Sequence, residues 1–410
     1  MKINRREWIQ TSWQASVLGA PMLLIPKLAA RATQDVRKRL RSGKAVFTDE
    51  LPTPSLLLDV DALEANIESM SRHARNAAVQ LRPHAKTHKC AEIARRQIRA
   101  GALGVCTATI HEAEALAAAD ISGILITSEL VGRNKITRLV ELTRRRPDTL
   151  SIVDSPEQAV QLSQAASAAK VTLNLLIDVD PGGRRTGVPA GEKVVRLAET
   201  ISGLSHLKLR GIHCYSGASA HVVGFEERRA HSVGVMAAPL ESFAQLKRAG
   251  MALEIFSGGS TGTYNIDPAL EGMTELQVGS YVFMDVDYRR IGGQRGPVYD
   301  DFLPSLSVVA TVISKNHEDR ATVDAGYKAF ATDRKFGPEI KGCSGVEFQF
   351  GGDEHGVLLL KEPSREIQVG DRLEFLVPHC DPNVNLYTEI YCVRGARVED
   401  VWPVTARGHS

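Results

Sequence analysis

The chain has 410 residues, of which 50 are Lys or Arg and 48 are Asp or Glu, so its formal net charge is only +2. Hydrophobic residues make up 43% and charged residues 24%, a composition typical of a soluble globular protein long enough for two domains. This balance excludes the basic surface of a nucleic-acid-binding protein and the low hydrophobicity of a disordered chain.

The N-terminal segment resembles a bacterial twin-arginine export signal. Arg5 and Arg6 precede a moderately apolar stretch from Ala15 to Ala30, and small residues follow it. Glycine and prolines interrupt the stretch, so it is too short for stable membrane insertion. We expect residues 1–32 to direct export of the folded protein to the periplasm and residues 33–46 to form a linker. The alternative is a basic extension on a cytoplasmic enzyme.

From Phe47 onward, short apolar runs alternate with longer amphipathic runs. The expected strands are Ser55–Asp59, Val79–Pro83, Gly104–Ala108, Ile124–Thr127, Leu150–Val153, Val171–Asp178, Leu207–His213 and Leu253–Ser257. The expected helices include Asp61–Ala77, His111–Ala119, Lys135–Arg145, Pro156–Ala169 and Phe225–Arg248. This α/β pattern predicts a TIM-type (βα)8 barrel over residues 47–286. A doubly wound parallel sheet is the alternative, because periodicity does not show closure.

After Val286 the helical periodicity stops and strand-like alternation takes over. The expected strands are Val298–Val312, Arg320–Asp324, Val346–Phe350, Glu354–Leu360, Asp371–Val377 and Thr388–Arg394. We therefore expect a C-terminal all-β domain over residues 287–410. The six cysteines lie in hydrophobic segments without CxxC spacing, so they are expected to be small core residues rather than a disulfide framework.

A first polar cluster, Arg82-Pro83-His84-Ala85-Lys86-Thr87-His88-Lys89, directly follows the second expected strand. Two histidines and two lysines are costly to bury, so their position next to an apolar strand indicates a site at the barrel mouth. Positive neighbours lower the pKa of a lysine amine, and Lys86 would then act as a Schiff-base nucleophile. The alternative is a solvated loop with both lysines pointing outward.

A second cluster, Phe256 to Tyr264, lies at the end of the last expected barrel strand and holds three glycines and four hydroxyl residues before its tyrosine. Backbone N–H groups in such a loop converge on an anion, and late barrel loops commonly bind phosphate. A simple strand-to-helix turn is the alternative.

A third cluster lies in the expected β-domain, where His379 and Asp381 are two residues apart. On an extended strand their side chains leave on the same face and would ligate one cation, while Cys380 faces the other way. The alternative is a surface salt link or a hydrogen-bonded turn.

Taken together, these blocks resemble the D-threonine aldolase and D-serine dehydratase family from about residue 48 to 405. The resemblance rests on Thr53-Pro54 before Leu56-Leu57-Leu58-Asp59, the lysine block, the Gly258–Thr261 loop, Glu275–Phe283 and His379-Cys380-Asp381-Pro382. It implies the alanine-racemase-like fold of pyridoxal-phosphate enzymes, a barrel plus a β-domain that is usually a homodimer with sites between subunits.

The resemblance also assigns roles to individual residues. Lys86 would carry pyridoxal 5'-phosphate, with Arg185 near the cofactor ring. Tyr215 and His221 would line the substrate side, although the ring packing of Tyr215 and helix capping by His221 are alternatives. Further cofactor contacts are implied for Gly258, Gly259, Ser260 and Thr261 as the phosphate cradle, and for Tyr281. Gln277 stands where relatives often carry arginine, which puts that contact in doubt.

Asp at position 381 favours the aldolase branch, because the dehydratases carry a cysteine two residues after the histidine. Oxygen and imidazole ligands suit Mn or Mg better than Zn. The hypothesis is that a β-hydroxy-D-amino acid such as D-threonine displaces Lys86 and that His379 and Asp381 hold a metal on its hydroxyl. His221 or a water on the metal would remove the hydroxyl proton, giving glycine and an aldehyde.

Two other functions remain open at this point. A D-serine or 3-hydroxyaspartate type of dehydratase would use Lys86 to remove the Cα proton and would release a keto acid and ammonia. A non-catalytic protein that only binds pyridoxal phosphate belongs to a different functional class, but it would need neither a β-domain nor a metal pair.

Overall fold

The computed structural model describes residues 25–408, and the chain divides into two compact units between Val46 and Phe47. The first unit holds α2 (Ile25–Arg41), which has no Gly or Pro after its second residue and ends before Gly43, whose φ is +75°. The expected linker over residues 33–46 therefore begins as helix. The twin-arginine motif of the expected signal lies outside the described residues. Within residues 25–408, the helices lack the length and apolar content needed to cross a membrane.

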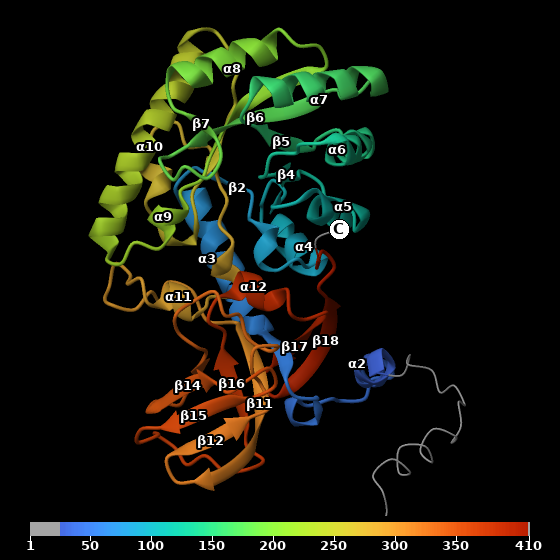
Figure 1. The fold of residues 1–410 in the computed structure, drawn as a ribbon, viewed down its shortest axis with the longest axis vertical. Helices are drawn as coiled ribbons and strands as arrows, with labels where there is room; N and C mark the ends of the chain where they lie inside the picture. Colours follow the sequence, from blue (N-terminus) through green and yellow to red (C-terminus); the bar gives the residue numbers. More distant parts are fainter. Residues whose placement is uncertain (1–24, 409–410) are drawn as a thin grey trace, which may run out of the picture. The chain divides into compact units, whose positions relative to one another are not determined.

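Parallel strands in the second unit form a barrel that helices surround (Figure 1). The strands are β2 (Gln80–Leu81), β3 (Cys106–Thr107), β4 (Leu125–Ile126), β5 (Leu150–Val153), β6 (Leu173–Asp180), β8 (Leu207–Cys214), β9 (Ile255–Gly258) and β10 (Glu275–Leu276). The helices are α3 (Val60–Asn76), α4 (Ala91–Arg99), α5 (Ile110–Ala118), α6 (Arg133–Arg145), α7 (Pro156–Ala169), α8 (Glu192–Ser202) and α10 (Phe225–Arg248). A short strand, β7 (Val188–Pro189), pairs parallel with the end of β6.

The order of the strands shows that the sheet closes. It runs β2-β10-β9-β8-β6-β5-β4-β3, with neighbouring strands parallel. A parallel bridge between His84 and Cys106 then joins the segment after β2 to β3, and Cys106 N–H donates to the Pro83 carbonyl at 2.8 Å. The predicted TIM-type barrel is confirmed, and the doubly wound sheet is excluded by this closure.

The expectation that Ser55–Asp59 is the first barrel strand is wrong. This segment is β1, and it pairs antiparallel with β11 (Leu306–His317) and parallel with β17 (Glu389–Arg394) in the sheet of the β-domain. Four consecutive buried residues mark a strand that is covered on both faces, but they do not reveal which sheet covers it. The barrel therefore begins at β2, and β10 is its eighth strand.

The expected β-domain is present and holds the remaining strands. They are β12 (Arg320–Val323), β13 (Glu339–Ile340), β14 (Val346–Phe350), β15 (Gly356–Leu360), β16 (Arg372–Leu376) and β18 (Arg397–Pro403), of which β13 and β18 were not expected. The expected strand Val298–Val312 begins only at Leu306, after Pro304, whose missing N–H suits a strand boundary. The domain is not purely β, because α11 (Val286–Arg289) and α12 (Cys380–Val384) follow the end of the barrel.

One continuous core connects the barrel to the β-domain. Side chains of α3, such as Leu63 and Met70, pack in the same buried cluster as Val308 of β11 and Phe375 of β16. A second cluster fills the space between the strands and the outer helices of the barrel. Five of the six cysteines are buried and all six are free, which agrees with their expected role as core residues.

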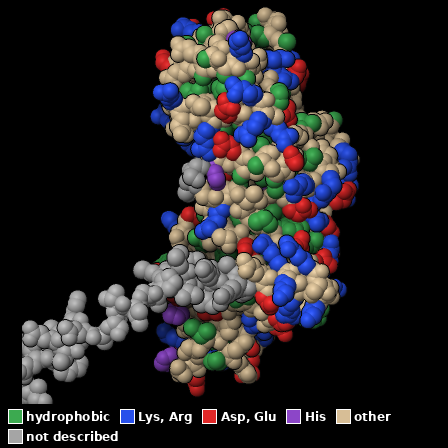
Figure 2. All heavy atoms as spheres, turned by 90° about the vertical axis from the view of Figure 1, so that its right-hand side faces the viewer, with side chains coloured by type: hydrophobic (Ala, Val, Ile, Leu, Met, Phe, Trp, Pro, Cys, Tyr) green, Lys and Arg blue, Asp and Glu red, His purple; other side chains and the backbone are tan. Residues whose placement is uncertain are grey.

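Several short helical segments lie where the barrel meets the β-domain, and they position the site described below. They are η2 (Ala85–Thr87), α9 (Gly217–Ala220), η3 (Thr261–Thr263), η4 (Asp267–Ala269) and η5 (Ser280–Val282). The segment η1 (Thr48–Glu50) precedes β1. The face of the molecule in Figure 2 carries Lys and Arg interspersed with Asp and Glu, as the near-zero net charge predicts.

A buried ion pair links the strands at which the barrel begins and ends. Arg82 Nε and Nη2 donate to the two carboxylate oxygens of Glu275 at 2.9 and 3.0 Å, and a third Arg82 donor binds the Gly123 carbonyl. We expect Glu275→Gln to lower the free energy of unfolding by roughly 3–5 kcal/mol, because it leaves the buried guanidinium without its counter-charge. Denaturant titration followed by tryptophan fluorescence measures the change.

The matched control is Glu254→Gln, which breaks the exposed ion pair with Arg210. It should change the free energy of unfolding by less than about 1 kcal/mol. Equal losses in the two variants would contradict the structural role assigned to Glu275.

His88 makes the stability of the fold depend on pH. Burial lowers its pKa to about 4, against 6.5 for an unperturbed histidine, although hydrogen bonds with Gln97 and Cys90 oppose the shift. The unfolded chain therefore binds a proton that the folded chain excludes between pH 6.5 and pH 4, and stability falls as pH falls through this window. Relative to His88→Gln, the wild type should lose about 3 kcal/mol between pH 7 and pH 4. Parallel stability–pH curves for the two proteins would refute this.

Candidate active site

The site lies where the first barrel strand ends against the β-domain. Lys86 belongs to η2, which follows β2, and α12 of the β-domain packs against η2. Lys86 Nζ donates to Asp381 Oδ2 at 2.5 Å, so the expected cofactor lysine and one expected metal ligand are in direct contact. The tertiary structure thus joins the first and third polar clusters of the sequence.

The expectation that positive neighbours lower the pKa of Lys86 is wrong, because its nearest charged partner is a carboxylate. The Asp381 carboxylate raises the lysine pKa, and its effect outweighs burial, which acts in the opposite direction. Burial alone would raise the pKa of Asp381, but the Lys86 ammonium holds it well below its usual range. Each charge therefore stabilises the other.

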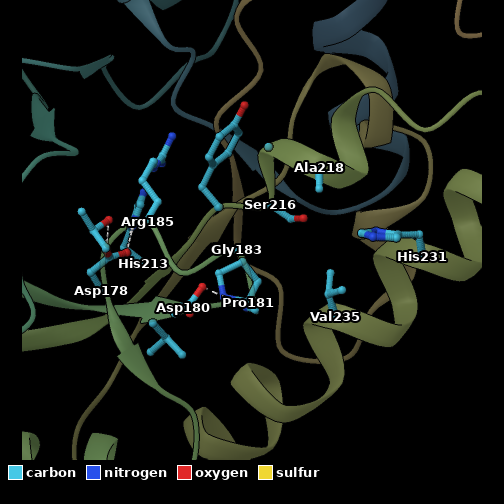
Figure 3. A pocket seen from close by; sticks show the side chains of 15 residues that line it. Asp178, Asp180, Pro181, Gly183, Arg185, His213, Ser216, Ala218, His231 and Val235 are labelled. Carbon is cyan, nitrogen blue, oxygen red and sulfur yellow. Dashed lines mark hydrogen bonds and ion pairs between the residues drawn. The ribbon is translucent and has the colours of Figure 1, made fainter.

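Two adjoining cavities share the lining residues Arg185, Thr186, His213 and Tyr215, and Lys86 lines one of them. The first has a volume of about 330 Å³ and is also lined by His84, Lys86, Ala108, Thr127, Ser128, Glu129 and Gln277. The second has a volume of about 370 Å³ (Figure 3). In Figure 3, Asp178, Arg185 and His213 gather at one end of this second cavity, while Ala218, His231 and Val235 lie toward the other end.

Arg185 and Tyr215, both expected in the site, are brought together. The Arg185 guanidinium lies 5.5 Å from the centre of the Tyr215 ring, a cation–π distance. Tyr215 follows β8, and Arg185 belongs to the loop after β6. Because parallel strands of a barrel end at the same face, these loops meet above the barrel mouth.

The walls of the cavities contain an acidic and imidazole network that the sequence analysis missed. His213 Nδ1 lies 2.5 Å from Asp178 Oδ1, and the Thr186 hydroxyl donates to Asp178 Oδ2 at 2.9 Å. Burial, reinforced by Asp178, raises the pKa of Glu129 to about 7. For Asp178 itself, burial acts upward but the adjacent His213 outweighs it and lowers the pKa.

Two polar atoms in these walls are buried without a hydrogen-bond partner in the described structure, His213 Nε2 and Glu129 Oε1. An unsatisfied buried polar atom costs about 1–3 kcal/mol, so such atoms on a cavity wall indicate a polar ligand. The signal for these residues was present in the sequence, because Asp178 and His213 stand at the ends of expected barrel strands.

The expected phosphate cradle lies behind the cavities rather than in their walls. Gly258, Gly259, Ser260 and Thr261 are buried and line neither cavity. Their glycines serve close packing, since a Cβ at Gly258 would lie 2.2 Å from the Cys214 carbonyl oxygen. The loop is nevertheless held against the segment after β8, where Ser216, Gly217 and Ala218 line the second cavity.

Two residues of the Glu275–Phe283 block lie in different environments. Gln277 lines the first cavity and donates from Nε2 to the Ser257 hydroxyl at 2.8 Å. Tyr281, expected to contact the cofactor, is instead a core residue whose hydroxyl accepts a hydrogen bond from Gln97. Its backbone N–H donates to Thr261 Oγ1 and so supports the glycine-rich loop from behind.

The expected extended geometry of the metal pair is wrong. His379 is extended, but it caps α12 and Asp381 lies within that helix, so the same-face argument does not apply. Within residues 25–408, no group of three or more His, Cys, Asp or Glu side chains is arranged to hold a metal ion. His379 and Asp381 therefore supply at most two protein ligands, one imidazole and one carboxylate.

His221 lies at the C-terminal end of α9, with its ring 4.8 Å from the ring of Tyr288. Burial lowers its pKa, although Asp287 acts in the opposite direction. His221 Nδ1 lies 3.2 Å from Asp287 Oδ2 without an aligned hydrogen bond, whereas Arg334 Nε donates to Asp287 Oδ2 at 2.8 Å. No motif pointed to Asp287 or Arg334, because their importance comes only from their neighbours in space.

Comparison with known proteins agrees with this architecture. Residues 58–287 match the model of the alanine racemase N-terminal domain, and residues 305–393 match that of a serine dehydratase domain. A D-threonine aldolase from Arthrobacter sp. is 39% identical over 87% of this chain and 93% of its own length. A 3-hydroxy-D-aspartate aldolase from Paracoccus denitrificans is 36% identical over 88% of this chain and 93% of its own length.

The chain belongs to the D-threonine aldolase and D-serine dehydratase family. Among solved structures of this family, D-threonine aldolase from Filomicrobium marinum superposes with a TM-score of 0.85 at 36% identity, covering 89% of this chain and 98% of the other. A D-threo-3-hydroxyaspartate dehydratase from Delftia sp. HT23 gives 0.79 at 27% identity, covering 89% and 99%. A mutant of a dehydratase of that name has been solved in a metal-free form, with a TM-score of 0.78. The alanine-racemase-like fold expected from the sequence is thereby confirmed.

Proposed function

We propose that this protein is a pyridoxal-phosphate-dependent and metal-dependent aldolase that cleaves D-threonine and related β-hydroxy-D-amino acids into glycine and an aldehyde. The observation that carries the proposal is the contact of Lys86 with Asp381 at the wall of a polar cavity. Two aldolase relatives, at 36% and 39% identity, support it over the dehydratase branch, where a D-threo-3-hydroxyaspartate dehydratase from Delftia sp. is 30% identical.

The cavity beside Lys86 fits the cofactor. Its wall carries the unsatisfied atoms of His213 and Glu129, and Arg185 with Tyr215 forms a second side. Lys86 would hold the cofactor there, and Arg185 would approach its ring. When bound, pyridoxal phosphate supplies an electron sink for the bond that breaks next to Cα.

Side chains of this protein would confine the substrate and accept its proton. Tyr215 and His213 would confine the substrate above the barrel mouth, because both line the two adjoining cavities. His221 would accept the proton of the β-hydroxyl, and its lowered pKa leaves the imidazole neutral and able to do so near neutral pH. Loss of that proton permits the Cα–Cβ bond to break.

His379 and Asp381 would hold the divalent metal, which supplies Lewis-acid activation of the β-hydroxyl when bound. One imidazole and one carboxylate suit Mn²⁺ or Mg²⁺ better than Zn²⁺. Asp381 Oδ2 lies 2.5 Å from Lys86 Nζ, so the residue that would hold the cofactor and one residue that would hold the metal are adjacent.

Export and assembly complete the proposal. The Arg5-Arg6 motif and the apolar stretch after it support twin-arginine export to the periplasm, while a cytoplasmic location is the alternative. The family resemblance supports a homodimer. Fractionation of cells that produce the full chain and a variant with Lys at positions 5 and 6 tests export, and light scattering tests assembly.

Trapping the cofactor tests the role of Lys86. The protein is loaded with pyridoxal phosphate, reduced with borohydride and digested. Peptide mass spectrometry should then find the pyridoxyl phosphate group on the peptide that contains Lys86. Lys86→Arg should abolish labelling because a guanidinium does not form the imine. The matched control is Lys89→Arg, three residues away, whose ammonium is already paired with Glu112 at 2.9 Å. Labelling at Lys89 in the wild type would overturn the assignment.

The reaction products decide between the alternatives. With pyridoxal phosphate, Mn²⁺ and D-threonine, we expect glycine and acetaldehyde in equal amounts, with loss of both on addition of a chelator. Asp381→Asn should reduce turnover at least 100-fold and weaken Mn²⁺ binding, because it removes the anionic ligand. The dehydratase branch would instead yield 2-oxobutyrate and ammonia. Cofactor binding without any product would leave only the non-catalytic function.

A further inference from the structure

A chain of alternating charges connects the two histidines of the site. It runs from His221 to Asp287, Arg334, Asp333 and then His379. Arg334 donates from Nε to Asp287 at 2.8 Å and from Nη1 to Asp333 at 2.9 Å, and Asp333 Oδ2 lies 2.7 Å from His379 Nδ1. We call Asp287, Arg334 and Asp333 the Asp–Arg–Asp bridge.

The geometry of Arg334 indicates a spacer rather than a ligand-binding arginine. Its two donors bind two different carboxylates instead of one, so the rigid guanidinium sets the distance between Asp287 and Asp333. A lysine in its place would offer a single point charge on a flexible stem. Because both carboxylates already neutralise it, Arg334 is poorly suited to bind an acidic substrate group as well.

Each carboxylate faces the Nδ1 side of a histidine. A carboxylate only accepts hydrogen bonds, so the network places a proton on His379 Nδ1 and leaves its Nε2 lone pair free for a metal. His221 Nδ1 makes no aligned hydrogen bond, and its orientation depends on the approach of Asp287 and on the ring of Tyr288.

The bridge also spans the two parts of the fold. His221 follows the β8 strand of the barrel, whereas Asp333, Arg334 and His379 come from loops of the β-domain. The α11 segment that carries Asp287 is tied to the β-domain through the Asp287 N–H, which donates to the Pro378 carbonyl at 3.2 Å. These three residues therefore link a proton acceptor on one part of the fold to a metal ligand on the other.

We propose that the Asp–Arg–Asp bridge positions His221 and His379 together, so that the proton acceptor and the metal act on the same substrate hydroxyl. This inference rests on the proposed aldolase function. Misplacement of a reacting group by about 1 Å can cost 100-fold in rate, which is why a spacer outside the cavity matters for turnover. Asp287, Arg334 and Asp333 are thus positioning residues.

The experiment separates the two ends of the bridge in the full-length protein loaded with pyridoxal phosphate. Mn²⁺ affinity is measured by electron paramagnetic resonance of the free ion, and kcat and KM are measured with D-threonine. Asp333→Asn should weaken Mn²⁺ binding 10- to 100-fold, because an amide can present its NH2 group to Nδ1 and favour the wrong tautomer. Asp287→Asn should leave Mn²⁺ affinity within about threefold and lower kcat at least 10-fold with little change in KM.

Arg334→Met should produce both defects, and Arg334→Lys should recover neither fully. The matched control is Arg290→Met, which breaks the exposed pair with Glu339 in the same surface groove and should alter neither quantity. Borohydride labelling of Lys86 should remain unchanged in every variant, which shows that the cofactor pocket is intact.

If the wild type is active and the variants keep both its Mn²⁺ affinity and its kcat, the positioning role of the Asp–Arg–Asp bridge is refuted. The proposed function would still stand. If Arg334→Met raises KM selectively for β-hydroxy-D-amino acids with an acidic β-substituent, the role of Arg334 is substrate binding and not positioning. A wild type that loads the cofactor but binds no Mn²⁺ would overturn the metal assignment and the bridge with it.

Discussion

The ion pair between Lys86 and Asp381 is the contact on which the organisation of the site depends. Asp381 is largely buried and Lys86 is partly buried at the junction of the barrel and the β-domain, where an unpaired charge is costly. Coulomb attraction offsets the desolvation of both partners and shifts their pKa values apart. The residues assigned to cofactor and metal thus neutralise each other's charge across this junction.

This pairing requires that the barrel and the β-domain hold a fixed relation, and the path of the chain provides it. The strand β1 is built into the β-domain before the chain enters the barrel, and the chain returns through α11 to complete the same sheet. The β-domain is therefore discontinuous in sequence, and its core continues into the side chains of α3. A shared core resists the relative movement that would separate Lys86 from Asp381.

The site also shows a division between residues that face the cavities and residues that hold them. Lys86, Arg185 and Tyr215 line cavities, whereas the glycine-rich loop and Tyr281 support the walls from behind. Close backbone approach explains the glycines of the loop without a ligand. The polar atoms without partners, on His213 and Glu129, mark where a ligand is needed to complete the hydrogen bonding.

Local patterns in the sequence predicted much of this molecule. The alternation of strands and helices predicted the barrel, and the helix Phe225–Arg248 was placed at its observed bounds. The end of a strand located Lys86, whereas Arg185 and Tyr215 came from the family resemblance. Periodicity reports how a segment is buried, but it does not report its partner, so β1 was assigned to the wrong sheet. The helices α11 and α12 were not predicted, because they are too short to show a helical period.

What the sequence by itself determined is the set of chemical groups and the family to which they belong. Only the tertiary structure decided which groups meet. Lys86 and Asp381 are 295 residues apart, and the pKa of the lysine changes direction because of that contact. Asp287, Asp333 and Arg334 carry no motif, since their effect arises from hydrogen bonds across the junction. Charge interactions depend on distance in space, which neighbouring residues in a sequence do not reveal.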